Sequence, residues 1–130
     1  MDLLGRARAL ARTSVLGDVP APALVALAER VRVIELAAGA RVTTRRDGSD
    51  FVLIVAAGAV VADGGDRTAG ALIGVGPALV GSAAVELCAA AGATLIEITV
   101  DDFLDVLVEH AVASAALARA LAEQLRGAPR

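Results

Sequence analysis

Between residues 31 and 100, short apolar runs alternate with glycine-containing turns, and this pattern restricts the fold more than any other feature of the sequence. The run 51–57 is continuously apolar, which suits a strand buried on both faces. Asp47-Gly48 precedes it and Gly64-Gly65 follows it as turn signals. Strands that recur about every eight to twelve residues between such turns are typical of a sandwich or a barrel. We therefore predict that the middle of the chain is entirely β.

Both ends of the chain have helical spacing instead. Apolar residues recur at intervals of three and four in the segments 2–13 and 22–31, and Pro22 suits the first turn of the second helix. Thr99 followed by Asp102 indicates a third helix start, because the hydroxyl and the carboxylate can each accept a bond from an end N–H group. A last helix is expected from about Ala111 to Arg126.

The predicted fold class is therefore mainly β with flanking helices (α+β). We expect an antiparallel β-roll or jelly-roll barrel with two N-terminal and two C-terminal helices. The 130 residues suffice for one domain, 1–130, with N-terminal helices in 1–30, the β-roll in 31–100 and C-terminal helices in 101–126. The chain has two Phe and no Trp or Tyr, so small aliphatic side chains must fill the core.

Charge and composition argue against several partners. The net charge of −3 offers no basic surface for direct binding of nucleic acid. A single cysteine, Cys88, excludes an intramolecular disulfide and fits a reducing compartment, and arginines interrupt any signal-like apolar region near the N-terminus. We expect a cytoplasmic protein. Residues 68–85 are uncharged, but four glycines and Pro77 make a poor spanning helix, so no membrane insertion is expected.

Few residues suit catalysis. His110 is the only histidine, whereas a cupin-like metal site needs several, and it falls at the junction of the two C-terminal helices. Gly81-Ser82 lacks the surrounding pattern of a nucleophile elbow, and Cys88 has no partner histidine in any recognisable motif. The carboxylates at 101, 102 and 105 complement a helix dipole. We predict no catalytic residue, no metal site and no enzyme.

The glycine-rich segment 70–85 is the best candidate for a binding loop. Its glycines allow backbone N–H groups to turn toward an anion, but nothing between Arg67 and Glu86 ionises. Two interpretations stay open: a buried corner of the β-structure, or an anion-binding cradle.

A second candidate site is the leucine stripe of the last helix. Leu117, Leu121 and Leu125 lie on one face, and small alanines beside them permit close approach of another helix. This stripe either covers the barrel or forms the seam of a homodimer, and the two roles are compatible.

The order of these elements is similar to that of a cyclic nucleotide-binding domain, and the likeness spans about residues 10–126. Segments that resemble the family's motifs are 16–29 (the first helical approach), 37–39 (its first β-turn), 47–50 (its Gly-Asp loop), 55–60 (a strand–turn–strand pattern), 76–81 (the approach to its phosphate-binding cassette) and 101–104 (the start of its hinge helix). The resemblance implies a signalling domain that acts on an effector domain of a longer chain, with cyclic AMP or cyclic GMP as its ligand.

The chain departs from that family in the cassette itself. The resemblance implies a Glu after Gly81 for the ribose and an Arg-Ser/Thr pair for the phosphate, but Ser82 follows Gly81, and the pair falls at Ala83 and Ala84. Loss of the Arg–phosphate contact costs on the order of 2–5 kcal/mol. We therefore expect a regulatory or oligomerisation module that has no cofactor and does not bind cyclic nucleotides in the family's usual way. The alternative is a sensor that binds a cyclic nucleotide or another anion through backbone groups of Gly74–Ala84, with Gly81, Ser82, Ala83 and Ala84 as the candidate binding residues.

Overall fold

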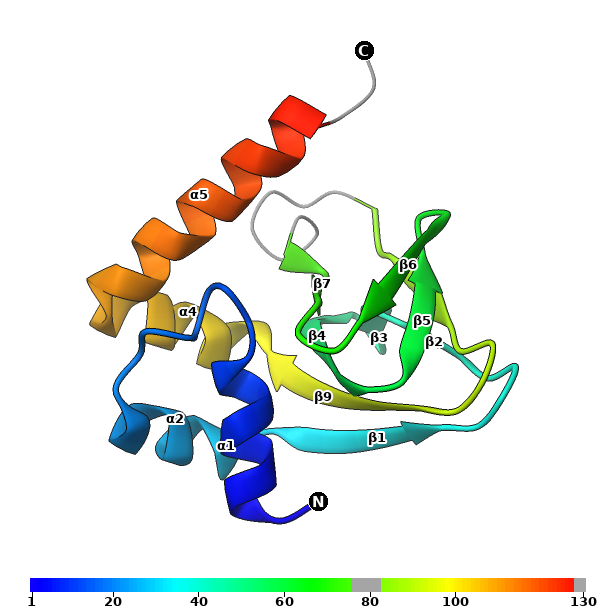
Figure 1. The fold of residues 1–130 in the computed structure, drawn as a ribbon, viewed down its shortest axis with the longest axis horizontal. Coiled ribbons are helices and arrows are strands. Elements are labelled where there is room, and N and C mark those ends of the chain that lie inside the picture. The colour runs from blue at the N-terminus through cyan, green and yellow to red at the C-terminus, as the bar shows by residue number, and fades with distance from the viewer. Residues whose placement is uncertain (76–82, 128–130) are drawn as a thin grey trace.

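The computed structural model describes residues 1–75 and 83–127. On the last helix, side chains are described as far as residue 123. Helices at both ends of the chain pack on one side of a β-roll (Figure 1), as the sequence pattern predicts. The helices are α1 (Leu3–Ala11), α2 (Ala21–Ala28), α4 (Val100–Glu109) and α5 (Ala111–Gly127). The strands are β1 (Arg32–Leu36), β2 (Arg41–Thr43), β3 (Arg45–Arg46), β4 (Ser49–Ala57), β5 (Ala59–Ala62), β6 (Gly65–Thr68), β7 (Leu72–Ile73), β8 (Glu86–Cys88) and β9 (Ala93–Thr99).

The roll consists of two antiparallel sheets. One has the order β1-β9-β4-β3, with β7 also paired to β4, and the other has the order β2-β8-β5-β6. The prediction of a strand buried on both faces is confirmed for β4, where Val52, Leu53, Ile54 and Val55 are all fully buried. One face of β4 contacts the helices and the other faces the second sheet, which is why the run has no polar position.

The core divides into two clusters along that sheet. The cluster on the helix side joins α1, α2, α4 and α5 to the sheet and includes Phe103. The cluster inside the roll is entirely aliphatic and includes Leu53, Leu87 and Leu95. Small aliphatic side chains thus fill the roll, as the composition predicts.

The predicted helix start at Thr99 is confirmed. Thr99 Oγ1 accepts a hydrogen bond from the backbone N–H of Asp102 at 3.2 Å, and two acidic residues occupy the first turn of α4. Pro22 lies in the first turn of α2, as expected. No helix in the described ranges is both long enough and apolar enough to span a membrane.

Two hairpins differ from the prediction. The segment 47–50, which resembles a loop of the family, contains a turn of only two residues: Asp47 and Gly48 have φ of 51° and 77°, and strand pairing begins on both sides of them. Asp63 and Gly64 form a similar turn, with φ of 52° and 74°, and the unpredicted strand β6 pairs with β5. A turn with two consecutive positive φ values matches the right-handed twist of the flanking strands. The polar residues on either side of each turn therefore pair as strands, although their hydropathy does not predict it.

Candidate functional site

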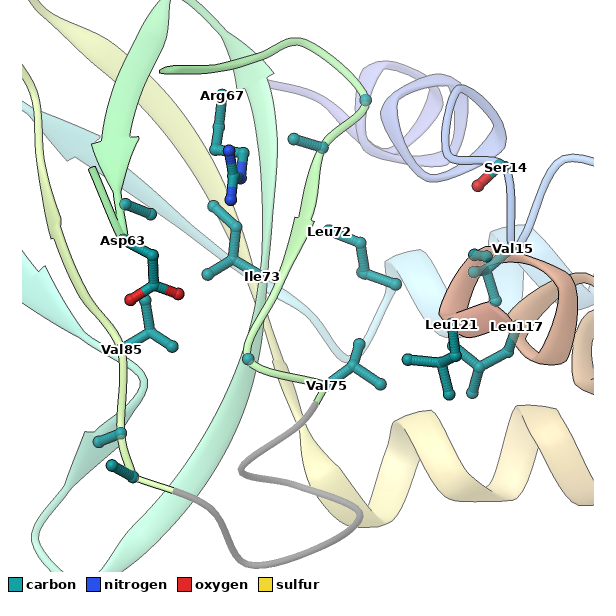
Figure 2. Close-up of a pocket in the computed structure, with 17 residues that line it drawn as sticks. Ser14, Val15, Asp63, Arg67, Leu72, Ile73, Val75, Val85, Leu117 and Leu121 are labelled. Atoms are coloured by element: carbon teal, nitrogen blue, oxygen red, sulfur yellow. The ribbon is translucent and has the colours of Figure 1, made fainter. Parts of the chain in front are cut away.

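A cavity of about 560 Å³ lies between the roll and α5. Its volume falls within the usual range for small-molecule sites, about 300–1,000 Å³. Figure 2 shows Arg67 and Asp63 on the side of the roll, Leu117 and Leu121 on the side of α5, and Leu72 between them. Segments 70–75 and 83–85, which border residues outside the described part of the chain, also line the cavity, as do Ser14 and Val15 after α1. The glycine-rich segment therefore borders a real cavity.

The four predicted ligand-binding residues are only partly placed. Ala83 and Ala84 line the cavity; Ala83 is exposed and Ala84 is half-buried. Gly81 and Ser82 lie outside the described residues, so binding at this loop stays a prediction. The methyl side chains at 83 and 84 offer no charge, and any anion contact from this wall must come from the backbone.

Thr44 holds the two ends of the glycine-rich segment together, a role that the sequence analysis did not detect. Its Oγ1 accepts a hydrogen bond from Val85 N at 3.0 Å, and its N–H donates to Val85 O at 3.0 Å. On the other side, a Cβ at Gly74 would lie 2.9 Å from Thr44 Cγ2 and 2.7 Å from the carbonyl oxygen of Phe51. Gly74 also has a φ of +97°, so glycine is required here for both space and conformation.

Arg67 and Asp63 are the only ionisable side chains that line the cavity in the described part of the chain. Both come from the hairpin of β5 and β6. Arg67 was not among the predicted site residues because β6 was not predicted. The alternation of inward and outward residues that starts at the Asp63-Gly64 turn would have placed Arg67 on the inner face.

One wall of the cavity belongs to α5. Leu117 is 6% exposed and lies in the core cluster, and Leu121 is half-buried against it. Ala113 and Ala116 are buried on the same face. The leucine stripe therefore covers the roll, one of the two roles that the pattern left open. The side chain of Leu125 lies outside the described residues, and the dimer seam stays a prediction.

Several solved structures share this fold. The sensor domain of the transcriptional regulator DNR from Pseudomonas aeruginosa superposes with a TM-score of 0.77 at 14% identity, over 93% of this chain and 94% of that chain. The regulatory domain of Toxoplasma gondii PKA, solved with cAMP, gives 0.75 at 17%, over 93% and 50%. Thermus thermophilus catabolite activator protein gives 0.69 at 18%, over 88% and 59%.

The fold is that of a cyclic nucleotide-binding domain. The likeness in sequence is too low to show more than the fold, and the chain spans about half the length of the PKA regulatory chain. No protein-family model matches the chain, and no curated protein matches it in sequence.

Within this cyclic nucleotide-binding-like fold, the remaining chemistry is sparse. The described residues contain no group of three or more His, Cys, Asp or Glu side chains that could hold a metal ion. His110 separates α4 from α5, where its N–H donates to Val106 O at 3.0 Å, and Cys88 is half-buried on β8. Neither residue lines the cavity. Among the described residues, the cavity therefore offers apolar contacts, one cation and one carboxylate.

Proposed function

We propose that this chain is a regulatory module in which a small ligand, bound between the roll and α5, controls the position of α5. The observation that carries the proposal is the shared wall: Leu117, Ala120 and Leu121 of α5 line the same cavity as the roll. A ligand there contacts both parts at once, so its binding energy depends on how α5 is docked. We infer that the module acts on an effector domain that contacts α5.

The joint between α4 and α5 suits such a movement. His110 is the single residue between the two helices, and its φ of −128° and ψ of 99° are extended. Ser114 Oγ donates a hydrogen bond to Leu107 O at 2.6 Å, and Ala113 N donates to His110 O at 3.0 Å. A change of the two dihedral angles at His110 would swing α5 and leave both helices intact, at the cost of the Ser114–Leu107 hydrogen bond across the joint.

Cyclic nucleotides are not the expected ligand in the family's usual mode. Ala83 and Ala84 stand at the positions where the resemblance implies the phosphate-binding Arg-Ser/Thr pair. We expect calorimetric titration of the purified chain with cAMP and with cGMP to give a Kd weaker than about 1 mM, because a charge-assisted phosphate contact worth several kcal/mol is missing. A Kd in the micromolar range would contradict this expectation and would support binding through the backbone of Gly74–Ala84.

The regulatory part of the proposal has its own measurement. Hydrogen exchange of the α5 amides, 111–127, is followed with and without a panel of small organic anions, and the amides of α1 serve as the internal control. We expect any anion that binds to slow or speed exchange in α5 more than in α1. Binding that leaves α5 exchange unchanged would contradict control through α5.

A homodimer is a second candidate function, favoured by exposed apolar side chains at the α4–α5 joint. Val108 is 86% exposed and Val112 is 37% exposed. If two copies meet here, the double variant Val108→Ser/Val112→Ser should weaken dimerisation at least about tenfold in sedimentation equilibrium, since each buried valine contributes about 1.5 kcal/mol or more. Leu4→Ser, at a 54% exposed position on α1, is the control. A monomeric wild-type chain, or equal effects of both changes, would exclude this surface.

A further inference from the structure

We propose that Arg67 is the anion-binding side chain of the cavity, and that the ligand is a small organic monoanion with an apolar body and a hydrogen-bond donor. This inference rests on the proposed function, because it assumes that the cavity binds a ligand. It differs from the family's usual arrangement in its source of charge: the cation comes from the β5–β6 hairpin and not from the glycine-rich segment.

The register of the hairpin fixes the direction of Arg67. Arg67 pairs directly with Val60, which is 1% exposed and lies in the core of the roll. Directly paired residues of antiparallel strands share a face, so Arg67 lies on the inner face of β6. The alternate residues Asp66 and Thr68 are exposed. Arg67 is half-buried there, so its stem is covered while its guanidinium stays accessible to a ligand in the cavity.

No carboxylate of the described residues supplies that partner. Arg67 Nη1 donates to Asp66 O at 3.4 Å, which is a long hydrogen bond, and Arg67 forms no ion pair with any described residue. Gly65 leaves room for the guanidinium, since a Cβ at that position would lie 2.7 Å from Nη1. The guanidinium thus retains N–H donors for an anion in the cavity, where a fork of donors matches a carboxylate or a phosphate.

The other lining residues restrict the rest of the ligand. Leu72, Val75, Leu117 and Leu121 present an apolar wall across from the hairpin (Figure 2). Asp63 is the second charge, and its carboxylate repels further negative charge while it accepts from a hydroxyl or an ammonium group. Beside this apolar wall, the described lining offers one cation and one carboxylate, and this balance of charge favours a monoanion with a donor over a dianion.

The test compares three probes of one chain length: octanoate, octanol and 2-hydroxyoctanoate. Calorimetry is performed on the wild-type chain and on Arg67→Gln, with Arg8→Gln, an exposed position on α1, as the matched loss of charge. We expect Arg67→Gln to weaken octanoate binding about tenfold or more and to leave octanol binding unchanged, because only the anion uses the guanidinium. Arg8→Gln should leave both affinities unchanged.

Two further variants separate charge from folding and test Asp63. Arg67→Lys keeps the charge but loses the fork, so it should bind octanoate with an affinity between wild type and Arg67→Gln. Asp63→Asn should bind octanoate more tightly and should lose the preference for 2-hydroxyoctanoate. Equal octanoate affinity of Arg67→Gln and Arg8→Gln would overturn the assignment of Arg67 while leaving the cavity as a binding site. Failure of all three probes to bind the wild-type chain would overturn both proposals.

Discussion

Replacement of Arg46 by methionine should lower the free energy of unfolding by about 3 kcal/mol. Arg46 forms an ion pair with Glu97, a carboxylate that is 6% exposed on the central strand β9. Glu97 shares a face of β9 with Leu95, so it points into the roll, and Arg46 reaches it from β3. Without the guanidinium, a buried carboxylate loses its partner, and this penalty is the main part of the expected loss.

Arg46 is a partly exposed partner, which keeps the expected loss at the lower end of the range for buried pairs. Its side chain is 30% exposed, and the guanidinium carbon lies 4.8 Å from the centre of the Phe51 ring. Methionine preserves the apolar contact with that ring while it removes the charge. The substitution thus removes the ion pair and the cation–π attraction but keeps the packing, and only the comparison with Glu97 variants isolates the ion pair.

Urea unfolding of four chains provides the measurement: wild type, Arg46→Met, Glu97→Leu and the double variant. We expect a coupling energy well above 1 kcal/mol, with the double variant more stable than Arg46→Met, because leucine suits a position beside Leu53 and Leu95. Arg45→Met is the control, since Arg45 pairs with Asp50 at side-chain exposures of 41% and 29%, and such a pair contributes less than about 1 kcal/mol. Equal losses for Arg45→Met and Arg46→Met would contradict the argument.

Glu97 also shows where sequence reasoning ends. Glu97 and Thr99 alternate with Ile96 and Ile98, a pattern typical of a strand with one polar face, yet both faces of β9 are buried, one under the helices and one inside the roll. A carboxylate is tolerated there only because Arg46 lies close in space although it is distant in the chain. Periodicity along one strand carries no information about that partner.

Elements with strong local signals were predicted well. The apolar run of β4, the cap at Thr99 and the two terminal helix pairs each depend on neighbouring residues, so the sequence contains their cause. Strands β3 and β6 do not: they are short and polar, and their pairing is dictated by the geometry of the adjoining turns.

The candidate site was predicted in part for the same reason. Ala83 and Ala84 of the glycine-rich segment were predicted as binding residues. They line the cavity, and their contact with a ligand stays a prediction. Arg67 was not predicted because it belongs to β6, which was itself not predicted. Thr44 was not predicted because its hydrogen bonds join segments that are far apart in sequence. The bonds of Thr44 depend on long-range pairing, which no local pattern encodes, whereas Arg67 follows from a local hairpin whose turn signal is present in the sequence.

Replacement of Phe103 by alanine should lower the free energy of unfolding by about 3–5 kcal/mol. Phe103 is fully buried and is among the largest side chains of the cluster that joins the helices to the sheet. Its neighbours there are mostly alanine, valine and leucine, and the chain has only one other phenylalanine. Short side chains on helices and strands that are packed together cannot move far enough to fill the space that an aromatic ring leaves.

Val108→Ala on the same helix is the matched control at a protein concentration where the chain is monomeric, because Val108 is 86% exposed and its truncation should change the stability of the monomer by less than about 0.5 kcal/mol. Phe103→Leu, which keeps more of the volume, should cost less than Phe103→Ala. His110 alone separates α4 from α5, so loosening α4 at Phe103 should also speed hydrogen exchange in α5, the helix that forms one wall of the cavity. If Phe103→Ala and Val108→Ala have equal effects on urea unfolding and on α5 exchange, then α4 does not anchor α5, and the control of α5 by the cavity would lack its fixed support.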